Sequence, residues 1–102
     1  IKTGKPHFNN KVAGLSGPAI KPMAVRIVYQ VYEKIKIPII GQGGISSLED
    51  TLEFIMAGAS AISIGTANLI EPSISVNILD ELQNYMIENK ISAISDIIGL
   101  AH

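Results

Sequence analysis

Two short apolar segments, each followed by a helix, are the feature that most constrains the fold of this chain. Residues 37–42 and 59–64 lack a clear alternation of apolar and polar positions, which is typical of strands covered on both faces. Residues 47–57 between them carry apolar positions at helical spacing and stop before Gly58. A helix that joins two such strands makes them parallel. The sequence therefore predicts an α/β fold, either part of a (β/α)₈ barrel or a doubly wound open sheet.

The remaining segments are assigned from turn formers and from apolar periodicity. Residues 1–19 are rich in Gly, Pro and Asn, which predicts a long loop with a small hairpin around Thr3–Gly4. Ser46 and Glu49 have the spacing of a capping box at the start of helix 47–57. The other expected elements are a helix over 22–35, a short helical turn over 66–69, a helix over 73–89 and a last short helix opening at Ser92.

Size and composition limit what the chain can do alone. With 102 residues, 47% of them apolar, it is one small domain at most, and such a chain leaves about a third of its surface in water. A mean hydropathy of +0.34 is high for that surface. Because the chain also opens on Ile1 without a signal sequence, we expect residues 1–102 to be a fragment of a single larger domain. Its apolar runs are far shorter than the ~20 residues of a membrane span.

Charge and cysteine content exclude several classes of site. The net charge is −1, with +6 through Lys36 and −7 from Ile37 onward. The lysines lack interleaved aromatic residues, so no nucleic-acid interface is predicted. The absence of cysteine excludes disulfides and thiolate zinc sites.

Three glycine-bearing loops lie where a parallel α/β fold places its ligand. They are residues 14–18, residues 41–44 and Gly65–Thr66. Glycine lets backbone N–H groups approach an anion closely, and a helix N-terminus adds a favourable dipole. Each loop could equally be a simple turn, and Thr66 could cap the short helix that follows it. Two such loops after adjacent strands make a phosphate cradle a reasonable hypothesis.

Other reactive side chains show no arrangement for chemistry. Ser16 lacks the G-x-S-x-G order and a placed Asp–His pair, so it is not expected to be a nucleophile. His7 and His102 are expected to be surface residues, without metal-ligand spacing. The acids of helix 47–57 are expected on its exposed side, where they solvate the helix; they are Glu49, Asp50 and Glu53.

Longer stretches of the chain resemble a known family. The stretches G-L-S-G-P-A-I-K-P at 14–22, P-I-I-G-Q-G-G-I at 38–45, A-G-A-S-A at 57–61 and G-T-A-N at 65–68 resemble the carboxyl-terminal part of bacterial dihydroorotate dehydrogenases of the NAD-linked class (class 1B). The likeness runs over essentially the whole chain in order and spacing. One departure is Ala13, where relatives usually carry a second glycine.

The resemblance implies an FMN-binding (β/α)₈ barrel that oxidises dihydroorotate to orotate in pyrimidine biosynthesis. It also implies that the flavin reaches Gly17 and that backbone at Gly43, Gly44, Gly65 and Thr66 holds its phosphate. The family's cysteine base, flavin-contacting lysine and orotate-binding asparagines would lie upstream of Ile1, so no catalytic residue is assigned and the chain alone is expected to be inactive.

The same resemblance implies further partners. These are the remainder of the catalytic subunit and an electron-transfer subunit with FAD and an iron–sulfur cluster that passes electrons to NAD, in a homodimer within a heterotetramer in the cytoplasm. Two other functions remain open: another FMN-dependent barrel oxidoreductase, or a non-catalytic phosphate-binding half-barrel module.

Overall fold

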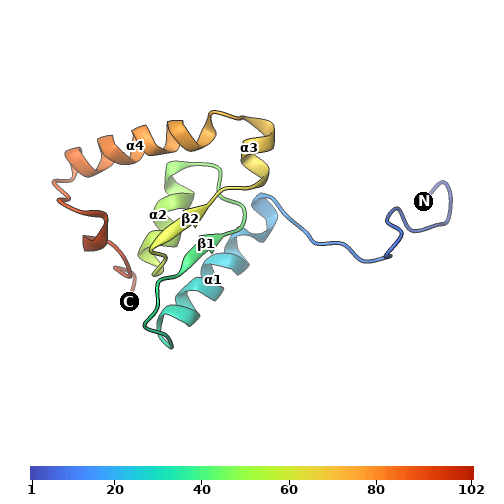
Figure 1. Ribbon diagram of the computed structural model, residues 1–102, viewed down its shortest axis with the longest axis horizontal. Helices are drawn as coiled ribbons and strands as arrows, with labels where there is room; N and C mark the ends of the chain where they lie inside the picture. The colour runs from blue at the N-terminus through green and yellow to red at the C-terminus, as the bar shows by residue number, and fades with distance from the viewer.

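The computed structural model describes residues 1–102 and shows a two-stranded parallel sheet with helices around it (Figure 1). The elements follow one another in the predicted order. They are the 3₁₀ turn η1 (Pro18–Ile20), α1 (Lys21–Tyr32), β1 (Ile40–Gln42), α2 (Leu48–Met56), β2 (Ala61–Ser63), α3 (Thr66–Ile70), α4 (Ile74–Glu88) and the 3₁₀ turn η2 (Ile94–Asp96). None of the helices combines the length and the apolar content that a transmembrane segment requires.

The βαβ unit predicted from the sequence is confirmed. Strands β1 and β2 pair in parallel, with Gly41 opposite Ile62, and α2 makes the connection between them. Both strands are shorter than predicted. Residues 37–39 precede the ladder, although the carbonyl of Ile39 still accepts hydrogen bonds from the N–H groups of Ser60 and Ala61.

The hairpin predicted at Thr3–Gly4 is wrong. The N–H of Gly4 donates to the carbonyl of Ile1 at 3.3 Å, which makes a single turn, and neither strand of the sheet comes from this region. Residues 1–16 are exposed and run away from the rest of the chain (Figure 1). Because no apolar surface packs against this segment, nothing stabilises a pair of strands there.

The core lies between the sheet and the helices α1 and α2. Its buried members are Val28, Ile45, Phe54, Ala57 and Ala59. Phe54 is fully buried and fills the space over Gly41, where a Cβ would lie 2.6 Å from the Phe54 ring. The opposite face of the sheet is open, because Ile40 of β1 is 68% exposed. The fold thus covers one face of its sheet only.

Helix α2 begins one residue later than the predicted capping box. Ser47 is the N-cap, and its hydroxyl accepts a hydrogen bond from the N–H of Asp50 at 3.2 Å, so Ser46 and Glu49 do not form the box. The predicted C-terminus is confirmed. Gly58 has a φ of 117°, and its N–H and that of Ala59 bond to carbonyls of the last turn, the pattern of a Schellman motif.

The end of the chain packs across α1 and α2. The ring of His102 stacks on Tyr29 with a centroid distance of 3.8 Å, and its Nε2 lies 3.1 Å from the carbonyl oxygen of Ala57. The expectation of surface histidines is confirmed for His7 and His102, which are both exposed, although the side chain of His102 is only 19% exposed because it packs on Tyr29. Sequence patterns missed this contact because it joins residues 45 positions apart.

Candidate functional site

Four of the five predicted site residues meet in one place. Gly17, Gly44, Gly65 and Thr66 line a hollow of about 50 Å³ at the carboxyl ends of the two strands. We call this space the glycine hollow. Its other lining residues are Pro18, Ile45, Ser46, Ala67 and Ile70. Because one water needs about 10–15 Å³, the glycine hollow has room for a group of several atoms.

The fifth predicted residue, Gly43, does not line the glycine hollow. A Cβ on Gly43 would lie 2.9 Å from the Cβ of Ala24 and 3.2 Å from the Cδ1 of Ile20, so the residue faces η1 and α1. Its φ of 129° is also one that side chains disfavour. Gly43 therefore allows the loop after β1 to approach α1 closely.

Gly44 and Gly17 bring the two walls of the glycine hollow together. Gly44 has a φ of 74°, and a Cβ on it would lie 2.7 Å from the carbonyl oxygen of Gly17. Gly17 has a φ of 92° and directly precedes η1. The sequence thus uses glycine where the loop after β1 and the loop before α1 are in backbone contact.

Hydrogen-bond donors around the glycine hollow are left without protein acceptors. The backbone N–H groups of Gly44, Ile45 and Gly65 donate to no oxygen of the protein. The side chain of Thr66 does not cap α3, because Gly65 is the N-cap and no side-chain cap bond is present. Backbone N–H groups without protein acceptors are available to bind an external anion.

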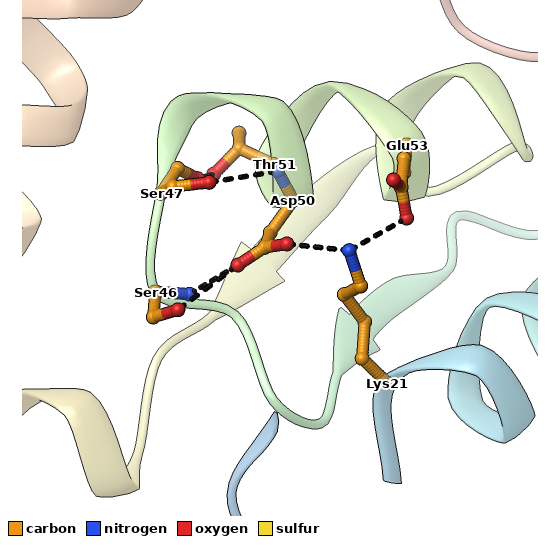
Figure 2. Close-up of polar contacts among 6 residues, drawn as sticks. All are labelled: Lys21, Ser46, Ser47, Asp50, Thr51 and Glu53. Atoms are coloured by element: carbon orange, nitrogen blue, oxygen red, sulfur yellow. Dashed lines mark hydrogen bonds and ion pairs between the residues drawn. The ribbon is translucent and has the colours of Figure 1, made fainter. Parts of the chain in front are cut away.

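A network of charged side chains lies beside the glycine hollow and links α1 to α2 (Figure 2). The Nζ of Lys21 donates to Asp50 Oδ1 at 2.6 Å and lies 3.0 Å from Glu53 Oε2. The other oxygen of Asp50 accepts from the N–H of Ser46 at 2.9 Å and from its hydroxyl at 3.0 Å. Both oxygens of this carboxylate are therefore occupied.

The expectation that all three acids of α2 are exposed is wrong for Asp50, which is 9% exposed, and confirmed for Glu49 and Glu53. Burial alone would raise the pKa of Asp50, but hydrogen bonds from Lys21 and Ser46 outweigh it and lower the pKa below its ordinary value. The hydrogen bonds from Lys21 to Asp50 and Glu53 raise the pKa of the lysine. The pair is ionised around neutral pH.

Sequence reasoning missed Lys21, Ser46 and Asp50 as members of one site. The signal that could have pointed to them is their position, since Lys21 opens α1 directly after the first glycine loop and Ser46 follows the second. An acid at the third position of α2 can reach back to the residue before the cap. No group of three or more His, Cys, Asp or Glu side chains could hold a metal ion.

The fold defines the chain as an α/β unit with a glycine-lined hollow at the carboxyl ends of two parallel strands, an architecture consistent with part of a (β/α)₈ barrel. A profile of the family described as dihydroorotate dehydrogenase matches residues 1–86. The chain belongs to the dihydroorotate dehydrogenase family.

Individual relatives agree with this assignment. The chain is 52% identical over 101 residues to the "Dihydroorotate dehydrogenase B (NAD(+)), catalytic subunit" of Malacoplasma penetrans, covering 99% of this chain and 33% of the relative. It is 50% identical over 99 residues to the protein of the same name from Thermoanaerobacter sp. (strain X514), covering 97% and 33%. The chain thus spans about a third of the length of these relatives.

A solved structure with a similar fold is the DHODH of Eimeria tenella in complex with ferulenol. It superposes with a TM-score of 0.81 at 33% sequence identity, over 94% of this chain and 27% of that one.

Proposed function

We propose that this chain supplies the FMN phosphate-binding loops of a dihydroorotate dehydrogenase catalytic subunit, a (β/α)₈ barrel that oxidises dihydroorotate to orotate. The observation that carries the proposal is the meeting of Gly17, Gly44, Gly65 and Thr66 around the glycine hollow. Family membership supports the reaction, and the relatives' name supports NAD as the electron acceptor.

The residues present fit a phosphate group. Backbone N–H groups of Gly44, Ile45 and Gly65 lack protein acceptors, and Thr66 lines the same hollow. Lys21 is neutralised by Asp50 and Glu53, so the phosphate would be held by neutral donors and by the loop geometry. FMN, when bound, supplies the redox chemistry, and this chain binds and orients it.

We further propose that the chain is part of a larger barrel and, as the family resemblance implies, its carboxyl-terminal part. The open face of the sheet supports a missing covering layer, because Ile40 is exposed there and both sheet edges are unpaired. The apolar groove beside β2 and α4 supports the same idea, since Ile62, Ile78 and Leu79 line it. Residues 1–102 would then belong to a single barrel domain and be inactive alone.

The relatives' description as catalytic subunits supports a separate partner subunit, and the family resemblance supports the further details. An electron-transfer subunit carrying FAD and an iron–sulfur cluster would pass electrons to NAD, and the complex would be a heterotetramer around a homodimer in the cytoplasm. The two other functions considered from the sequence are less well supported, because the family profile spans 86 of 102 residues and the sheet is open on one face.

The test uses the intact catalytic subunit that contains this chain. The purified subunit should carry one flavin, and anaerobic dihydroorotate should bleach the flavin absorption band. It should also bind FMN at least tenfold more tightly than riboflavin, because only FMN has a phosphate for the glycine hollow. Equal affinity for the two flavins would contradict the role of the glycine hollow, and absence of bleaching would contradict the reaction.

A further inference from the structure

One carboxylate connects the two walls of the glycine hollow. Asp50 Oδ1 accepts from Lys21, the first residue of α1, which follows Gly17 of the first wall by four residues. Asp50 Oδ2 accepts from the N–H and the hydroxyl of Ser46, which lines the second wall two residues after Gly44. Figure 2 shows Lys21 and Ser46 reaching Asp50 from opposite sides.

The carboxylate of Asp50 and the two loops that it connects are held in place by neighbouring contacts. A Cβ on Gly44 would lie 3.0 Å from the Cβ of Lys21 and 3.1 Å from the Cα of Pro18, so the two walls are already in contact beside the ion pair. Asp50 is held in turn by the cap of α2, since its N–H donates to Ser47 Oγ at 3.2 Å. The carboxylate is thus fixed to a helix that packs in the core.

We propose that Asp50, acting through Lys21 and Ser46, is a positioning residue that sets the distance between the two walls of the glycine hollow and thereby its affinity for the phosphate of FMN. This inference rests on the proposed function. It assigns no contact between Asp50 and the cofactor. Its content is that the side chains of Asp50, Lys21 and Ser46 fix the loop that carries the N–H groups of Gly44 and Ile45 relative to Gly17.

For Asp50→Asn, electrostatics alone predicts a change in FMN affinity opposite to the one that the positioning role predicts. Removing the negative charge of Asp50 would favour a nearby phosphate dianion, so Asp50→Asn would tighten FMN binding if charge alone mattered. Positioning predicts weaker binding, because the single amide oxygen of Asn cannot accept from Lys21 and Ser46 in the way that two carboxylate oxygens do. The direction of the change therefore separates the two explanations.

The experiment measures the dissociation constants of FMN and riboflavin by flavin fluorescence on the intact catalytic subunit stripped of its flavin. Asp50→Asn should weaken FMN binding by about tenfold, the size expected for losing one hydrogen bond to a charged group, and should change riboflavin binding less than about twofold. Lys21→Met should act in the same way, and Lys21→Arg should restore most of the affinity.

Two controls keep the outcome interpretable. Glu53→Gln removes the exposed partner of Lys21 without touching Ser46 and should leave both constants within about twofold. Ser46→Ala keeps the backbone donor and should cause a smaller loss than Asp50→Asn, which covers the case that the aspartate variant does not fold.

Unchanged or tighter FMN binding by Asp50→Asn would overturn the inference, as would equal weakening of both flavins. If the unsubstituted subunit itself binds FMN no better than riboflavin, the proposed function fails first, and that result is visible before any variant is made.

Discussion

The replacement Gly44→Ala tests whether the glycine hollow is built by backbone contact. Gly44 has a φ of 74°, a conformation that costs an L-residue about 1–2 kcal/mol. The new Cβ would lie 2.7 Å from the carbonyl oxygen of Gly17 and 3.1 Å from the Cα of Pro18, both backbone atoms that cannot rotate away. Overpacking of this kind costs about 1–3 kcal/mol.

The two effects together should lower the free energy of unfolding by about 2–5 kcal/mol. The assay is urea unfolding of the intact subunit, followed by circular dichroism. Gly14→Ala is the matched control, because Gly14 has no positive φ and no atom within 4 Å of an added Cβ. If both variants unfold within about 0.5 kcal/mol of the parent protein, the described contact between the loops is wrong.

Three further predictions concern the core, the ion pair and the end of the chain. Phe54→Ala should lower the free energy of unfolding by about 3–5 kcal/mol in the same urea assay, because Phe54 is fully buried, and a loss under about 1 kcal/mol would contradict that burial. Because the pKa of Asp50 is lowered on folding, its carboxylate stabilises the fold fully above the ordinary pKa of 3.8, and this stabilisation is lost as the pH falls through the lowered pKa. Because the pKa of Lys21 is raised on folding, its ammonium group stabilises the fold fully below the ordinary pKa of 10.5, and this stabilisation is lost as the pH rises through the raised pKa. Asp50→Asn should therefore flatten both limbs of a plot of stability against pH, and unchanged limbs would refute the pairing. His102→Ala should cost about 1 kcal/mol, measured by thermal unfolding, through loss of the stack on Tyr29, and no change in melting temperature would argue against that stack.

Most of the fold could be predicted because local sequence patterns determine its helices and strands. The apolar stripe of α2 and the glycine after it gave both ends of that helix to within a residue or two, and the two strand segments were found in order. The prediction of a hairpin at Thr3–Gly4 was wrong because strand pairing is not decided by local patterns alone. Turn residues indicate where a chain can bend, but pairing depends on apolar contacts that residues 1–16 do not make.

The candidate site was predicted in part. Gly17, Gly44, Gly65 and Thr66 could be proposed together from glycine placement and family resemblance, and the structure brings them to one hollow. The burial of Asp50 could not be foreseen, because a charged residue among other acids on a helix usually faces solvent. Its burial depends on Lys21, which lies 29 residues earlier in the chain.

The most direct test of the central claim is an amide-proton NMR spectrum of the intact, isotopically labelled subunit with each flavin. If the glycine hollow holds the phosphate, the N–H resonances of Gly44, Ile45 and Gly65 should shift strongly downfield with FMN and stay near their free positions with riboflavin. Equal shifts with both flavins, or none with FMN, would show that these amides do not bind the phosphate.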